Sequence, residues 1–193
     1  MAETRFVVGG PDGWLRVRKD LGGEVVSIAE YTKVQLTAQR SGRDHFTPIE
    51  GVLAGIPCSV VAGNLSKNAP EYGGPARLTF NLTRQRLNYP GGFVRAITDP
   101  RNPIPVGTHP IQMPDFPHGL GAGYSGQTPY AKTWFYLGNG VAVAGRSDRY
   151  LHPGSVSAGC ITVDASGWTA LYRYLILCRS GNGKTVGSVT VVR

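Results

Sequence analysis

A histidine, a serine, a glycine and a cysteine lie close together in the C-terminal third of the chain. They are His152, Ser157, Gly159 and Cys160. A thiol becomes a strong nucleophile when a neighbouring imidazole accepts its proton, and the thiolate can then attack an amide or ester carbonyl. The segment therefore predicts acyl transfer, with Cys160 as the nucleophile and His152 as the general base.

Gly159 and Ser157 are expected to shape this site. A glycine ahead of the cysteine lets the backbone turn sharply, so the main-chain N–H groups of Gly159 and Cys160 would face a developing oxyanion. Ser157 either orients the catalytic pair or donates to the substrate. The alternative is that Cys160 is a small buried side chain in a core strand with Ile161 and Val163, and these residues alone leave both interpretations open.

The sequence SAGCI at residues 157–161, with His152 ahead of it, resembles the S-x-G-C-[IV] signature of the L,D-transpeptidase (YkuD-type) family. The sequence IPVGTHPI at residues 104–111 is similar to that family's T-P-x-G-x-[FY]-x-I strand. The resemblance covers residues 76–193 and implies a cysteine enzyme that remodels peptidoglycan stem peptides. It also implies a mainly β fold, an L,D-transpeptidase-like β-sandwich with one principal helix after the catalytic cysteine.

Two departures from the family pattern bear on the site. Cys160 follows His152 by eight residues, which is closer than usual for the family and resembles its secreted antibacterial effector branch. The family often has an arginine two residues after the cysteine, where this chain has Thr162, so a substrate carboxylate would have to bind elsewhere. The candidates for substrate binding are Arg146, Arg149, Tyr150 and His118.

The composition predicts a folded, turn-rich chain that forms one domain or a small module plus a catalytic domain. The 193 residues include 27 glycines and 14 prolines, which favours many short strands over a helical bundle. The formal net charge of +8 favours anionic surroundings, which are nucleic acid, an anionic membrane or a bacterial envelope, and charge alone does not choose among them. The 20 Lys and Arg residues are scattered, so no dedicated nucleic-acid patch is indicated.

The sequence shows no signal peptide and no apolar run of membrane-spanning length. We therefore expect action in the periplasm or cell wall after export by a specialised secretion route, and an immunity protein as partner if the chain is an effector. Three cysteines exclude a disulfide scaffold, and Cys58 and Cys178 are expected to be structural. No metal-binding spacing is present, and no cofactor is expected.

Apolar alternation indicates the elements that must position the site. Residues 1–72 are expected to form an SH3-like or β-extension region, with strands near 13–18, 24–29 and 33–37 and later strands within 50–61. Residues 63–75, rich in Asn, Ser, Gly and Pro, are expected to form a linker.

Residues 76–193 are expected to form the catalytic domain. The predicted strands are 76–82 and 93–97 as one hairpin, 133–137 and 141–144 joined by a Gly138-Asn139-Gly140 turn, and a last strand at 185–192. The loop 112–130 is a candidate lid. Asp164 or Ser166 should begin a helix whose buried stripe is Trp168, Leu171, Tyr172, Leu175 and Ile176.

Two other functions fit the same residues. One is a cysteine amidase or endopeptidase that cuts a different bond of peptidoglycan. The other is a non-catalytic envelope-binding module in which Cys160 belongs to the core. For an acyl-transfer enzyme, the sequence leaves the acceptor open among an amine, a free D-amino acid and water.

Overall fold

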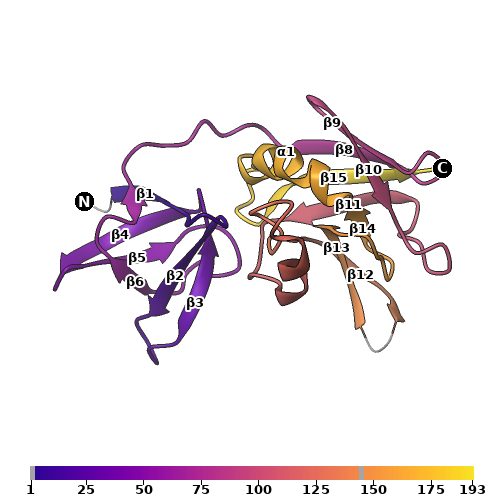
Figure 1. Ribbon diagram of the computed structural model, residues 1–193. Coiled ribbons are helices and arrows are strands. Elements are labelled where there is room, and N and C mark those ends of the chain that lie inside the picture. The colour runs from indigo at the N-terminus through magenta and orange to yellow at the C-terminus, as the bar shows by residue number, and fades with distance from the viewer. Residues whose placement is uncertain (1–2, 144–145) are drawn as a thin grey trace.

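The computed structural model describes residues 3–143 and 146–193, without the side chains of residues 141–143 and 146. The chain forms two β-sheets that lie side by side (Figure 1). We call residues 3–66, with their seven-stranded sheet, the N-terminal unit, and residues 76–193, with their eight-stranded sheet, the C-terminal unit. Residues 67–75 connect them (Figure 1). The prediction of a mainly β protein is confirmed.

The sheet of the N-terminal unit has the order β3-β2-β6-β5-β4-β1-β7 and encloses its own small core, which includes Phe46 and Cys58. Its strands are β1 (Glu3–Val7), β2 (Trp14–Lys19), β3 (Val25–Ala29), β4 (Lys33–Arg40), β5 (Arg43–Pro48), β6 (Cys58–Val61) and β7 (Leu65–Ser66). The sequence did not predict β5, because Phe46 is the only large apolar residue of that strand and Asp44 is buried beside it.

The sheet of the C-terminal unit has the order β11-β15-β8-β9-β10-β14-β13-β12, and its edge strands β11 and β12 also contact each other. The sheet therefore curls nearly into a barrel. Its elements are β8 (Ala76–Asn81), β9 (Arg86–Tyr89), β10 (Gly92–Ile97), β11 (Gly107–Gln112), the 3-10 helix η1 (Gly119–Tyr124), β12 (Phe135–Val143), β13 (Arg146–Pro153), β14 (Ile161–Val163), α1 (Ala165–Ile176) and β15 (Thr185–Val192).

Helix α1 forms as predicted and covers the inner face of this sheet. Asp164 is its N-cap, and the carboxylate accepts the Ser166 N–H at 3.0 Å, which satisfies a backbone donor that the helix leaves free. A Cβ at Gly167 would lie 2.7 Å from Val94 Cγ1, so the helix approaches β10 closely. The predicted stripe is buried in full and comprises Trp168, Leu171, Tyr172, Leu175 and Ile176.

The predicted hairpin between residues 76–82 and 93–97 is wrong in detail. Strand β9 lies between them and pairs with β8 on one side and with β10 on the other. The turn at Pro90 and Gly91 joins β9 to β10. The four residues of β9 were missed because only Leu87 among them is fully buried, which leaves almost no alternation to detect.

The predicted Gly138-Asn139-Gly140 turn is also wrong. Strand β12 runs through these residues and pairs with β13, with an irregular register after Tyr136. Gly138 has φ +107°, which is typical of a bulge glycine. A Cβ at Gly140 would lie 2.2 Å from Arg149 Nε, so this glycine makes room for an arginine that crosses from the neighbouring strand.

A buried polar interface joins the two units. Among the described residues, three side-chain hydrogen-bonded pairs cross it: Trp14 with Thr133, Glu30 with Tyr172, and Glu50 with Arg179. Arg179 donates to Glu50 through Nη2 at 2.9 Å and Nε at 3.1 Å, and to the carbonyl of Tyr31 at 3.1 Å. Since both charged side chains are buried, each depends on the other for solvation.

Candidate active site

Parallel pairing of β13 and β14 brings Cys160 beside the strand that carries His152. Leu151 pairs with Ile161, and both are fully buried. Side chains alternate along a strand, so Tyr150, His152 and Thr162 point to the opposite face. Cys160 immediately precedes β14, level with Tyr150, and its sulfur lies against the backbone of β13.

The short spacing between His152 and Cys160 is explained by how the chain returns. Adjacent parallel strands are usually joined by a crossover of a dozen or more residues. Here only the loop 154–160 separates them, because β14 begins level with Leu151 and the loop travels back along about two residues of β13. A loop that reverses so tightly needs its backbone held in place.

Arg149 and Gly159 fix that loop. Gly159 has φ +107°, and a Cβ there would lie 1.5 Å from Arg149 Nη1. The Arg149 guanidinium passes beneath the glycine and donates to the Ala158 carbonyl at 2.7 Å and to Asn102 Oδ1 at 2.8 Å. Position 159 therefore requires glycine both for its backbone conformation and for space.

Ser157 holds the same loop from the other side. Its hydroxyl donates to the carbonyl of Cys160 at 2.9 Å and accepts the Gly159 N–H at 3.2 Å. The Gly159 N–H, one of the two oxyanion donors expected from the sequence, is thus already bonded. The role of Ser157 in this structure is to close the turn ahead of the cysteine.

Cys160 is partly exposed, and its environment keeps the thiol protonated. Burial raises the pKa of the Cys160 thiol, and the Tyr150 N–H and the Arg149 guanidinium act in the opposite direction. The sulfur lies 3.3 Å from the Tyr150 nitrogen, which donates to it. Within the described part of the chain, no hydrogen bond joins Cys160 Sγ to His152.

His152 is held by hydrogen bonds at both ring nitrogens. Nδ1 lies 2.9 Å from the Pro153 carbonyl, which only accepts, so Nδ1 carries a proton. Nε2 lies 3.1 Å from Thr162 Oγ1. Burial lowers the pKa of His152 to about 4, so the ring is neutral at pH 7 and its Nε2 lone pair accepts the Thr162 hydroxyl proton.

Stacked rings fix the plane of the His152 imidazole. Trp134 stacks on it with centroids 4.4 Å apart. Trp134 also stacks on His118 at 4.4 Å, and His118 in turn stacks on Phe116 at 4.3 Å. The ring of Tyr150 packs edge-on against His118 and Trp134. The loop predicted as a lid thus contributes two rings to an aromatic wall beside the candidate catalytic pair.

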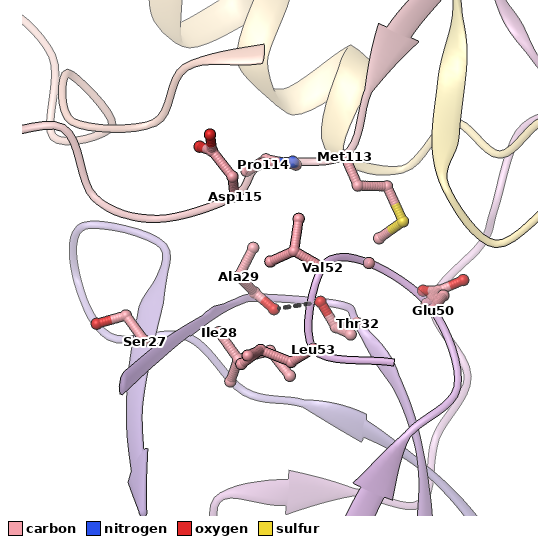
Figure 2. Close-up of a pocket in the computed structure, with 11 residues that line it drawn as sticks. Ser27, Ile28, Ala29, Thr32, Glu50, Val52, Leu53, Met113, Pro114 and Asp115 are labelled. Atoms are coloured by element: carbon pink, nitrogen blue, oxygen red, sulfur yellow. Dashed lines mark hydrogen bonds between the residues drawn. The ribbon is translucent and has the colours of Figure 1, made fainter. Parts of the chain in front are cut away.

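Asp115 ties this wall together and connects it to the N-terminal unit. Its carboxylate oxygens lie 2.9 Å from His118 Nε2 and 3.1 Å from the Tyr150 hydroxyl, which donates to it. Figure 2 shows a small hollow between the units, with Pro114 and Asp115 on one side and Ala29 and Val52 on the other. The Asp115 carboxylate points away from the N-terminal unit. The N-terminal unit therefore lies behind the segment that carries Asp115 and His118, on the side away from the Asp115 carboxylate.

The sequence-predicted residues are brought together unevenly. Tyr150 contacts Cys160 through its N–H, and His118 lies in the aromatic wall with its Nε2 bonded to Asp115. Arg149, a candidate for substrate binding, is buried beneath the cysteine loop. The side chain of Arg146, the other arginine candidate, lies outside the described residues.

Sequence reasoning missed three residues of the site. Thr162 was noted only as a departure from a family pattern, and Asp115 gave no local signal at all. Trp134 precedes β12, in which Phe135 and Tyr136 point to opposite faces of the sheet. Aromatic residues on both faces were the available sign that the second face is also covered by side chains.

Comparison with protein-family models, curated proteins and solved structures finds no match to this chain. Among the described residues, no group of three or more His, Cys, Asp or Glu side chains is placed to hold a metal ion. In the same part of the chain, no helix is both long and apolar enough to cross a membrane. Cys58 and Cys178 are free and buried.

Proposed function

We propose that this chain is a cysteine acyl-transfer enzyme that acts on peptidoglycan stem peptides, as an L,D-transpeptidase, an L,D-carboxypeptidase or a D-amino-acid exchange enzyme. The observation that supports the proposal is the parallel register of β13 and β14, which brings Cys160 level with Tyr150 and two residues along the neighbouring strand from a neutral, oriented His152. The sequence resemblance at residues 157–161 names the substrate class.

The resting pair consists of a thiol and a neutral imidazole. The Thr162 hydroxyl proton first turns to the Val156 carbonyl, which frees the Nε2 lone pair of His152. Cys160 then attacks the carbonyl of the amide bond that follows the L-centre of diaminopimelate, and the S–C bond forms as His152 Nε2 takes the thiol proton. Since the Gly159 N–H is bonded to Ser157, we assign the oxyanion to the Cys160 N–H. The C–N bond then breaks, and His152 returns the proton to the departing D-alanine amine.

Thr162 supports both protonation states of His152. Its hydroxyl lies 3.1 Å from His152 Nε2 and 3.3 Å from the Val156 carbonyl. When the imidazole is neutral, Thr162 donates to Nε2. When the imidazole is protonated, Nε2–H donates to Thr162, whose own proton turns to Val156. The thioester is finally released by an amine, a free D-amino acid or water, which gives cross-linking, exchange or trimming.

A second candidate function is favoured by one observation. Burial raises the pKa of the Cys160 thiol, which is the property of an unreactive structural cysteine. A non-catalytic envelope-binding module, in which the aromatic wall and the net positive charge bind the cell wall, is consistent with such a thiol. The amidase or endopeptidase alternative has the same nucleophile and differs only in the bond that is cut.

The deciding experiment is mass spectrometry of disaccharide tetrapeptide muropeptides incubated with the wild type and with Cys160→Ala. Loss or exchange of D-alanine by the wild type alone supports the acyl-transfer proposal and identifies the acceptor. Release of a longer fragment supports the amidase or endopeptidase. Intact muropeptides, together with measurable binding to both proteins, support the binding module.

A further inference from the structure

A pocket lies beside Thr162 on the same face of the sheet as His152. Its lining residues are Arg95, Ala96, Ile97, Gly154, Ser155, Thr162 and Asp164. Thr162 follows Cys160 by two residues of strand, which corresponds to about 7 Å. A group bound in this pocket is therefore about one long side chain away from the backbone of Cys160.

Arg95 brings a positive charge to this pocket at a cost to the sheet. In the ladder between β10 and β9, Arg95 pairs directly with Arg86, and like charges at opposing positions destabilise a sheet. Arg86 is accommodated, since its guanidinium lies 3.6 Å from the Phe93 ring centroid and its Nε donates to Asn88. Arg95 is exposed, and within the described residues its guanidinium has no hydrogen bond or ion pair.

Asp164 brings the opposite charge to the same pocket. It is the residue across from Arg95 on the adjacent strand end, and its N–H donates to the Arg95 carbonyl at 3.0 Å. One carboxylate oxygen accepts the hydroxyl and the N–H of Ser166, which lower the pKa of this carboxyl, and the charge of Arg95 lowers it further. The two side chains do not form an ion pair in the described structure, so each can bind a ligand of opposite charge.

We propose that this pocket binds a zwitterionic amino-acid group, with its carboxylate on Arg95 and its ammonium on Asp164. The inference rests on the proposed function and names what that site recognises. Such a group has two sources in the reaction. One is the free amino-carboxylate end of a diaminopimelate side chain. This end is separated from the other stereocentre of diaminopimelate by four bonds of about 1.5 Å each. The other is a free D-amino acid that acts as acceptor.

The proposal is tested by binding to Cys160→Ala, which keeps the pocket and removes the nucleophile. Isothermal titration with a diaminopimelate tetrapeptide, a lysine tetrapeptide and free D-alanine compares a zwitterion, a lone ammonium and the acceptor. Arg95→Gln in this background should weaken binding of the diaminopimelate peptide at least about tenfold, because a charge-assisted contact to its carboxylate is lost. Binding of the lysine peptide, which lacks this carboxylate, should change little. Arg77→Gln, an exposed arginine of β8 outside the pocket, is the matched control.

The outcomes separate the pocket from the catalytic proposal. Loss of diaminopimelate binding assigns the pocket to the donor side chain, whereas loss of D-alanine binding alone assigns it to the acceptor. If Arg95→Gln and its parent bind the diaminopimelate peptide and D-alanine equally well, the proposed zwitterion pocket is wrong, whether or not the wild type acts on muropeptides. If Arg95 governs binding but the wild type leaves muropeptides intact, the pocket stands and the acyl-transfer proposal fails.

Discussion

The hydroxyl of Thr162 lies 3.1 Å from Nε2 of His152. The Pro153 carbonyl, 2.9 Å from Nδ1, fixes the tautomer of the candidate base. The imidazole donates through Nδ1 to this carbonyl and accepts at Nε2 from Thr162. Four predictions follow from this geometry and from the elements around it.

Thr162→Val should lower kcat for D-alanine release at least about tenfold with little change in KM, because proton transfer loses its oriented base while substrate contacts remain. Thr162→Ser keeps the hydroxyl and should stay within about threefold of the wild type, since the same proton path is available. Steady-state kinetics on a tetrapeptide muropeptide measures both. A valine variant as active as the serine variant would contradict a role for the hydroxyl.

Gly159→Ala should abolish activity and lower the free energy of unfolding by about 1–3 kcal/mol, because alanine at φ +107° is strained and its Cβ would overlap the Arg149 guanidinium. Gly123→Ala is the matched control, since nothing lies within 4 Å of a Cβ built there. It should change stability by no more than about 0.5 kcal/mol. Urea denaturation and activity assays on both variants test the prediction, which an active Gly159→Ala protein would refute.

The stability of the protein should fall between pH 7 and pH 4.5 through His152. Its pKa is lowered from 6.5 to about 4 in the folded state, so the unfolded chain binds the additional proton in this window and acid favours unfolding. The loss attributable to this group is about 2 kcal/mol at pH 4.5. Denaturation curves at the two pH values should show a smaller drop for His152→Gln, and an equal drop would place the titration elsewhere.

Alkylation by iodoacetamide should label Cys160 alone in the folded protein, since Cys58 and Cys178 are buried. The alkylation rate should continue to rise at pH values above the pKa of an ordinary thiol, because burial raises the pKa of Cys160. Mass spectrometry of the labelled peptide, with Cys160→Ala as the blank, measures the rate. A rate already at its plateau at pH 6 would show a preformed thiolate and contradict the neutral pair.

The amino-acid sequence by itself determined the elements whose signals are local. The stripe of helix α1 and its Asp164 cap, the long strand at residues 185–192, and the turn that ends in Gly159 and Cys160 all depend on residues within a few positions of one another. Such patterns reflect the backbone preferences of the residues and the burial of one face of the element, so they do not depend on which distant segments pack against it.

The tertiary structure decided the features that depend on pairing between distant segments. The Gly138-Asn139-Gly140 sequence favours a turn locally, but pairing with β13 and the passage of Arg149 beside Gly140 keep it in a strand. The parallel register of β13 and β14 set Thr162 against His152.

The residues gathered around the candidate pair were equally out of reach of local patterns. Asp115 and Trp134 come from segments that only the closed sheet brings to this face, and Arg95 comes from the far side of β14. Their roles could not be read from the sequence, because side-chain neighbours across a sheet are set by strand order and register, which no short stretch of residues specifies.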